Sequence, residues 1–175
     1  MKKIFTLYII ALCFALSCKD NGTEAAPEEK PEEVVGGSVS TNLDNALLLK
    51  LVNQQRLAGC NCGATVMPGV PALTWNEKLA QAALNHSKDM NESGFFSHTS
   101  SDGKTLSERF NAVGYNWRAI AENIASGQKD EQTVFSSWIK SEGHCKNIMS
   151  ASYKEMGAAR AGSYWTQDFG TQTAN

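Results

Sequence analysis

The first segment in which apolar and polar positions alternate at helical spacing lies between residues 42 and 58. Thr41 stands just ahead of this pattern and Asp44 follows three residues later, which has the form of an N-terminal capping box. We therefore expect a helix over residues 42–58, ending at Gly59. Its apolar face consists of leucines: Leu43, Leu47, Leu48, Leu51 and Leu57.

The strongest helical pattern lies between residues 74 and 94. Thr74 and Glu77 have the spacing of a second capping box, and Gly94 provides a stop. The residues that share one face of this predicted helix are Trp75, Leu79, Ala82, Ala83, His86 and Met90.

Two shorter helices are expected further on. Thr105 and Glu108 form a third capping box, which begins a short helix ending near Gly114. A fourth helix begins after Asp130. It presents four apolar residues to the core: Val134, Phe135, Trp138 and Ile139.

The C-terminal part has the pattern of a β-hairpin. Residues 155–161 and 164–169 are strand-like segments on either side of Gly162-Ser163. Residues 119–125 form an apolar stretch too short to assign to a strand or a turn. These elements predict an α+β fold in which helices flank a small central antiparallel sheet.

The first residues have the layout of an export signal. Lys2 and Lys3 precede an apolar run that ends at residue 16, and this run is too short to cross a bilayer comfortably. Residues 15–18, Ala-Leu-Ser-Cys, resemble a lipobox, in which the cysteine receives a diacylglycerol. We expect a lipoprotein signal peptide over residues 1–17 and lipidation of Cys18. The alternative is an ordinary secretory signal followed by an incidental cysteine.

Residues 18–40 have the composition of a tether. From residue 19 onward this segment contains five glutamates, two prolines and no aromatic residue. It cannot bury enough apolar surface to order itself, so we expect a disordered acidic linker behind the lipidated cysteine. Two acyl chains would hold the chain to a bacterial membrane, which predicts a location in the cell envelope, either periplasmic or exposed at the surface.

Charge and length narrow the class of the folded part. Removal of residues 1–17 takes two of the 16 basic and none of the 18 acidic residues, so the formal net charge changes from −2 to −4. A net negative charge does not favour binding to nucleic acid. Residues 41–175 suffice for one hydrophobic core and not for two, and we expect a single monomeric domain.

The cysteines of the folded part are expected to oxidise. Three remain once the signal is lost and Cys18 is lipidated: Cys60, Cys62 and Cys145. Disulfides persist in an exported protein, so one bridge and one leftover thiol are expected. A zinc site made by the three cysteines with His144 is the alternative.

The histidines are the main candidates for chemistry. His86 lies on the apolar face of its predicted helix, where a buried, hydrogen-bonded role is expected. His98 and His144 fall in loops or at helix ends, and Glu122 lies in an apolar stretch where a carboxylate needs a partner. Two neutral imidazoles and a carboxylate suit Zn²⁺ with an open position, and they equally suit a hydrogen-bonded cluster that stabilises a cleft.

Several segments together resemble bacterial members of the CAP superfamily, the cysteine-rich secretory, antigen 5 and pathogenesis-related proteins with an SCP-like domain. The resemblance spans nearly all of residues 43–170. Its segments, in chain order, are 73–76 with His86, 96–98 with 102–103, 114–115, 122–125, Trp138 with 141–144 and 147–149, and 164–167.

The resemblance implies an α-β-α sandwich with a central cleft lined by two histidines and two acidic residues. The cleft residues of the family match His98, Glu122 and His144 of this chain. Where relatives carry the second acidic residue, this chain has residues 139–141, Ile-Lys-Ser, so Glu142 is its nearest substitute.

The resemblance also implies a disulfide between Cys145 and either Cys60 or Cys62. Such a bridge would pin the first interhelical loop beside His144. Closing a loop of more than 80 residues stabilises the fold by about 4–5 kcal/mol on the chain-entropy model.

Three functions remain open at the level of sequence. The first is a binding module whose cleft engages a lipid, a glycan or a protein and which requires no cofactor. The second is a divalent-metal-dependent hydrolase, in which His98 and His144 hold Zn²⁺ or another divalent cation and Glu122 is a ligand or general base. The third is a purely structural envelope protein.

Overall fold

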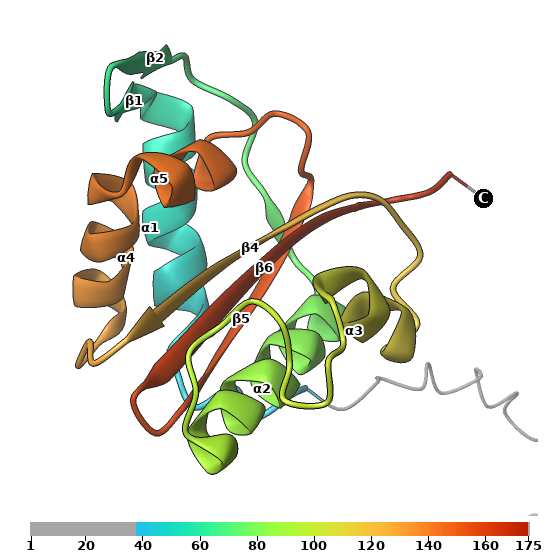
Figure 1. Ribbon diagram of the computed structural model, residues 1–175. Coiled ribbons are helices and arrows are strands. Elements are labelled where there is room, and N and C mark those ends of the chain that lie inside the picture. The colour runs from blue at the N-terminus through green and yellow to red at the C-terminus, as the bar shows by residue number, and fades with distance from the viewer. Residues whose placement is uncertain (1–37, 175) are drawn as a thin grey trace, which may run out of the picture. The chain divides into compact units, whose positions relative to one another are not determined.

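The computed structural model describes residues 38–174, which form the helices and strands drawn in colour in Figure 1. The predicted signal peptide, Cys18 and the tether up to residue 37 lie outside the described residues. The boundaries of the predicted segments at residues 17, 18 and 40 therefore stay predictions.

A four-stranded sheet forms the middle layer, with the strand order β3-β5-β6-β4. The strands are β3 (Thr74–Trp75), β4 (Trp117–Ser126), β5 (Glu155–Ala161) and β6 (Tyr164–Gln172). β6 pairs antiparallel with both β5 and β4, and the two-residue β3 adds a parallel edge beside β5. The predicted hairpin is thus present, and the stretch 119–125, which the pattern left unassigned, is part of the edge strand β4.

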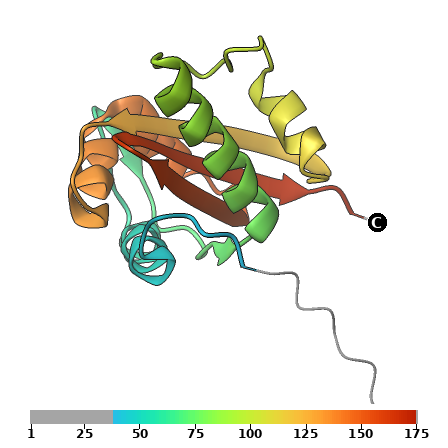
Figure 2. The ribbon, with the colours of Figure 1, turned by 90° about the horizontal axis from the view of Figure 1, so that it is seen from below.

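Helices cover both faces of this sheet (Figures 1 and 2). α2 (Glu77–Ser93) and α3 (Leu106–Ala112) lie on one face, and α1 (Asn45–Ala58), α4 (Glu131–Lys140) and α5 (Glu142–Ile148) lie on the other. A separate hairpin of β1 (Cys60–Cys62) and β2 (Thr65–Met67) stands next to α5. The expected α+β sandwich is confirmed.

The central strand β6 is buried along almost its whole length because helices pack on both of its faces. Its alternate side chains point to opposite layers. Trp165 and Phe169 belong to the main core beneath α1, α4 and α5, whereas Thr166 and Asp168 point to the layer of α2. Polar groups on the α2 side of the sheet are therefore enclosed together.

Two helix starts differ from the sequence prediction. α2 begins after Asn76, whose side chain accepts hydrogen bonds from Lys78 N and Leu79 N, and Thr74 is not the N-cap. Thr74 and Trp75 form β3 instead, because the Thr74 N–H pairs with the Lys154 carbonyl. An extended strand cannot also be the first turn of a helix.

At α1 the capping residue is Asp44, which accepts from Leu47 N, so the helix starts at residue 45 and not at 42. The capping box of Thr105 and Glu108 is confirmed, as are the start of α4 after Asp130 and the left-handed stop of α2 at Gly94. The sequence pattern did not predict α5, a single short element of seven residues.

Candidate functional site

The candidate site is built around Glu122, whose side chain is only 2% exposed. Glu122 lies on the edge strand β4, and the alternation of the strand turns its carboxylate to the layer of α2 and α3. His98 donates from Nδ1 to Oε1 at 2.7 Å, and Arg109 donates from Nη2 to Oε2 at 2.6 Å. Both carboxylate oxygens thus have charge-assisted partners, as a buried carboxylate requires.

Arg109 of α3 positions the loop as well as the carboxylate. Its Nη1 donates to the carbonyl of His98 at 2.8 Å, and its side chain is only 6% exposed. One guanidinium therefore holds both the backbone of the loop that carries His98 and the acid that orients the His98 ring. Arg109 was not predicted from the sequence, because an arginine in a short helix has no pattern that distinguishes it from a surface residue.

His86 has the buried, hydrogen-bonded role expected of it. It is fully enclosed in α2, where Nε2 donates to the Ser97 carbonyl at 2.8 Å and Nδ1 lies 3.4 Å from the Ser100 hydroxyl. Burial lowers the pKa of His86 more than the nearby Glu122 charge raises it. A neutral ring is consistent with one donating and one accepting nitrogen, and this ring ties the loop of His98 to α2.

His144 reaches the same region from the opposite layer. It lies on α5, which the side-chain amides of Asn123 and Asn147 join to β4: Asn123 donates to the His144 carbonyl and Asn147 to the Glu122 carbonyl. The Asn123 bond therefore places the His144 backbone beside β4, at the residue next to Glu122.

The pKa values of the exposed His98 and the half-buried His144 are shifted in opposite directions. The hydrogen bond to Glu122 raises the pKa of His98 above its usual value, whereas burial and then the His98 charge lower the pKa of His144. Burial would raise the pKa of Glu122, but the hydrogen bond from His98 and the charge of Arg109 outweigh it and lower that pKa. Near neutral pH the site thus combines a carboxylate, a more readily protonated His98 and a neutral His144.

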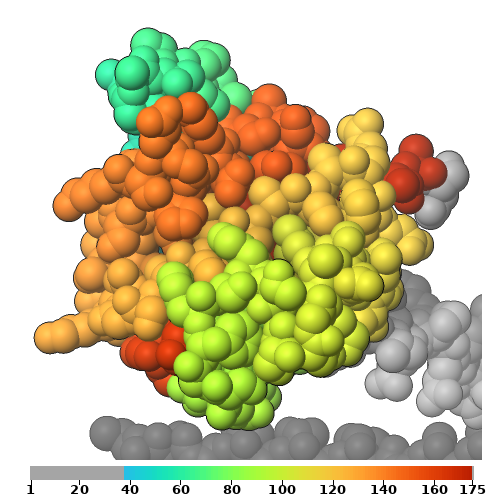
Figure 3. Space-filling view, in the orientation of Figure 1, coloured from blue at the N-terminus to red at the C-terminus, as the bar shows by residue number. Residues whose placement is uncertain are grey.

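The His98 side chain is 59% exposed above the buried Glu122. In the space-filling view, a hollow lies between the light-green loop after α2 and the orange segment of α5 (Figure 3). A second cavity of about 230 Å³ lies on the outer side of Arg109, between α2 and α3. Its polar lining includes Asn85, Asp89, Ser100 and Lys104.

Glu142 stands apart from the other predicted site residues. Its carboxylate accepts from Lys146 Nζ at 2.6 Å in the first turn of α5 and is 54% exposed. Within residues 38–174, no hydrogen bond or ion pair joins Glu142 to His98, Glu122 or His144. The structure therefore joins His98 directly to Glu122 and places the His144 backbone beside β4, and binding roles for His144 and Glu142 stay predictions.

Asp168 is a second buried acid that the sequence analysis missed. It lies directly opposite Glu122 on β6 and is fully buried, and neither of its oxygens has a hydrogen-bond partner among the described residues. Burial, and then the charge of Glu122, raises its pKa well above the usual value. An alternation of polar residues in the strand 164–172 was the one available clue.

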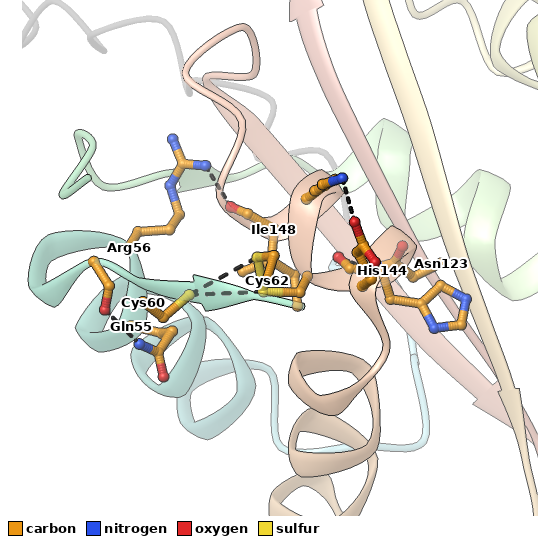
Figure 4. Close-up of a disulfide and its surroundings, with 11 residues drawn as sticks. Gln55, Arg56, Cys60, Cys62, Asn123, His144 and Ile148 are labelled. Atoms are coloured by element: carbon orange, nitrogen blue, oxygen red, sulfur yellow. Dashed lines mark hydrogen bonds and ion pairs between the residues drawn. A yellow bond between two sulfur atoms is a disulfide. The ribbon is translucent and has the colours of Figure 1, made fainter. Parts of the chain in front are cut away.

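The structure pairs Cys62 with Cys145 through a disulfide, which selects between the two bridges that were expected. The three sulfurs of Cys60, Cys62 and Cys145 lie within 4.8 Å of one another, so this cluster could hold a metal ion once the disulfide is reduced to thiolates. The ring of His144 points away from them (Figure 4). A zinc site that combines the three cysteines with His144 is therefore wrong.

The profile of the cysteine-rich secretory protein family (CAP) matches residues 49–172 of the chain. With the sandwich fold described above, this match shows that the chain belongs to the CAP family.

Three relatives illustrate the likeness. The uncharacterized membrane protein YlbC of Bacillus subtilis (strain 168) is 33% identical over 104 residues, which cover 59% of this chain and 30% of YlbC. An extracellular SCP-domain protein of Bacillus anthracis str. Ames is 27% identical with a TM-score of 0.65, over 73% of this chain and 40% of that one. An outer surface protein of Borrelia burgdorferi, 17% identical, has the same fold, with a TM-score of 0.58 over 73% and 89% of the two chains.

This chain spans less than half the length of two of these relatives. These three relatives are themselves described as a membrane protein, an extracellular protein and an outer surface protein. Every helix within residues 38–174 is too short or too polar to span a bilayer.

Proposed function

We propose that this chain is an exported, membrane-anchored binding module of the CAP family that engages a lipid, a glycan or a protein of the cell envelope. The observation that carries the proposal is the contrast between a buried, fully bonded Glu122 and an exposed His98 that it orients. The network holds a polar ring in one direction at the surface, and it does so before any ligand arrives.

Two properties of the site favour binding of a polar or anionic group. With Nδ1 committed to Glu122, His98 presents Nε2–H outward, and its raised pKa keeps that donor charged over a wider pH range. The His144 backbone is bonded to Asn123, the residue next to Glu122, and its lowered pKa keeps the His144 ring neutral near pH 7, so this ring can donate or accept. A phosphate, a carboxylate or sugar hydroxyls supply the matching acceptors, which a bacterial envelope offers on lipids, glycans and proteins.

The anchor is the second part of the proposal. Lipidation at Cys18 and a tether to residue 40 would hold the domain near the membrane, on its periplasmic or outer side. The descriptions of the relatives as membrane, extracellular and outer surface proteins support a location in the envelope.

The test of ligand binding compares the wild-type chain with His98→Gln/His144→Gln. Co-sedimentation with purified peptidoglycan sacculi and with phosphatidylglycerol vesicles probes glycans and lipids, and crosslinking in an envelope extract probes proteins. We expect at least a tenfold weaker association for the double variant. Lys88→Gln, an exposed change elsewhere on α2, serves as the control and should bind as the wild type does.

Equal binding by the wild type and the double variant would sink the proposal. Absence of binding to all three probes would favour the purely structural reading, in which changes at Glu122 lower the melting temperature and do nothing else.

A divalent-metal-dependent hydrolase is the second candidate, favoured by one observation. A histidine whose other nitrogen donates to a carboxylate is the usual arrangement behind a metal-bound imidazole, and His98 has it with Glu122. The fit is incomplete, however, because Glu122 already accepts from Arg109 as well. Within residues 38–174, the three cysteines form the only group of three His, Cys, Asp or Glu donors within 4.8 Å.

Metal binding separates the two candidates. Titration calorimetry with Zn²⁺ at pH 7.5 should show uptake that is lost in His98→Gln/His144→Gln if the site is a metal centre, and that persists in Cys60→Ser. The binding-module proposal expects no difference between the wild type and the double variant in this measurement.

A further inference from the structure

The three cysteines lie where the β1–β2 hairpin meets α5, the helix that also carries His144 (Figure 4). Cys62 is bonded to Cys145, and the thiol of Cys60 lies beside this bond. Its Sγ is 3.6 Å from the Sγ of Cys145 and 3.9 Å from the Sγ of Cys62. One thiol is thus near van der Waals contact with both sulfurs of the disulfide.

The strand β1 explains this arrangement. Side chains two residues apart in a strand point to the same side, so Cys60 and Cys62 both face Cys145. The bonded pair is fully buried, whereas Cys60 is half-buried and lines an open surface hollow with Val66 and Met67. Solvent therefore has access to the thiol and not to the bridge.

We propose that Cys60, Cys62 and Cys145 form a thiol–disulfide exchange site in which Cys60 and Cys62 compete for the same bond to Cys145. The Cys60 thiol loses its proton to solvent, and its thiolate attacks the sulfur of Cys145. The Cys60–Cys145 bond forms, the Cys62–Cys145 bond breaks, and the electron pair leaves with Cys62, which takes up a proton. The number of disulfides and thiols is unchanged, so no oxidant or reductant takes part.

Attack at Cys145 is favoured over attack at Cys62. A bond between Cys60 and Cys62 would join two residues of one strand whose Cα atoms are about 6.6 Å apart, near the upper limit for a disulfide. The Cys60 sulfur must swing from its place beside the bond into line with it. β1 can supply this movement, because it has only three residues and its one partner strand is β2.

The rest of the site stays in place during exchange. Arg56 of α1 is fully buried and donates from Nη1 to the carbonyls of Ile148, at 2.6 Å, and Ser150, at 2.9 Å. These bonds hold the end of α5 independently of the disulfide. Exchange therefore moves the hairpin relative to Cys145, whose neighbour in the chain is His144.

The test uses the full chain with Cys13→Ser and Cys18→Ser, so that three cysteines remain. Burial raises the pKa of Cys60, so the protein is incubated without added thiol at pH 8.5, where more thiolate is present. The protein is then brought to a mildly acidic pH to stop exchange and unfolded in urea, so that N-ethylmaleimide also reaches buried thiols, and tandem mass spectrometry locates the label. We expect label on Cys62 to reach at least a tenth of that on Cys60, and label on Cys60 alone would overturn the proposal.

Two variants complete the test. Cys60→Ser is the control and should show no label on Cys62. Cys62→Ser should form the Cys60–Cys145 bridge, with no thiol reactive to Ellman's reagent and a melting temperature above that of Cys145→Ser. Two reactive thiols in folded Cys62→Ser would overturn the proposal. Failure of Cys62→Ser to fold, where Cys60→Ser folds, would also overturn it, because Cys60 then cannot replace Cys62.

Discussion

Glu122 on β4 and Asp168 on β6 lie directly opposite each other, and both carboxyl groups are buried beneath α2 and α3. Glu122 has two charged partners, His98 and Arg109, whereas Asp168 has none among residues 38–174. Burial and the Glu122 charge raise the pKa of Asp168, so this pair carries one negative charge, located on Glu122. Glu122 keeps the negative charge that orients His98 while Asp168 stays protonated.

Asp168→Asn should remove a pH dependence of stability. The pKa of Asp168 is higher in the folded than in the unfolded state. Protonation of Asp168 therefore stabilises the fold fully below the unfolded pKa of 3.8, and this contribution is lost as the pH rises towards the folded pKa. Asparagine is isosteric and stays neutral. The melting temperature of Asp168→Asn should therefore equal that of the wild type at pH 3.5 and exceed it at pH 7, by about 4 °C for each kcal/mol of difference in unfolding free energy. Thermal unfolding from pH 3.5 to 8 measures this difference, and parallel curves for the two proteins would contradict it.

Glu122→Gln should destabilise the fold strongly. The change leaves the buried Arg109 guanidinium without its counter-charge, and breaking a buried ion pair costs about 3–5 kcal/mol. Urea unfolding measures the loss. Glu142→Gln is the matched control, since its pair with Lys146 is half exposed and should contribute less than about 1 kcal/mol. Similar losses in the two variants would show that Glu122 is not the centre of the network.

His98 should titrate separately from His86 and His144 in NMR spectra. His98 should lose its proton above pH 6.5, because Glu122 stabilises the charged ring. His144 and His86 should lose their protons below pH 6.5, because burial disfavours the charged form of each ring. The raised pKa means that the His98–Glu122 contact stabilises the fold fully below pH 6.5 and that this contribution is lost as the pH rises through the folded pKa. His98 assigned to a midpoint below that of His144 would refute this order.

The sequence predicted elements where the local signals were complete. Thr105 and Glu108 made a capping box that the structure confirms, and Gly162-Ser163 marked the hairpin. Thr74 was assigned wrongly as the N-cap of α2, because a capping-box pattern contains no information on the partner Lys154, 80 residues away. Local patterns cannot show which of two structures a residue joins when the competing bond is long-range.

The candidate site was predictable only through the family resemblance. His98 and Glu122 are 24 residues apart and share no periodic pattern, and His144 comes from the opposite layer. Arg109 and Asp168 had neither a motif nor a counterpart in the resemblance. Their importance follows from burial alone, since a charged or acidic side chain that is enclosed must have its charge balanced or removed.

Gly157→Ala should prevent α2 from packing on the sheet that carries Asp168. A Cβ at Gly157 of β5 would lie 2.1 Å from the backbone nitrogen of Ala80, where no side chain can move aside. We expect destabilisation of more than about 4 kcal/mol, since overpacking against backbone forces the helix away from β5 and β6. The matched control is Gly143→Ala in α5, where a Cβ meets nothing within 4 Å, and it should stabilise the fold by about 0.5 kcal/mol. Thermal unfolding of both variants, with the His98 resonance as a reporter of the site, decides the matter: a folded Gly157→Ala protein with an unchanged melting temperature would show that α2 does not approach the sheet this closely.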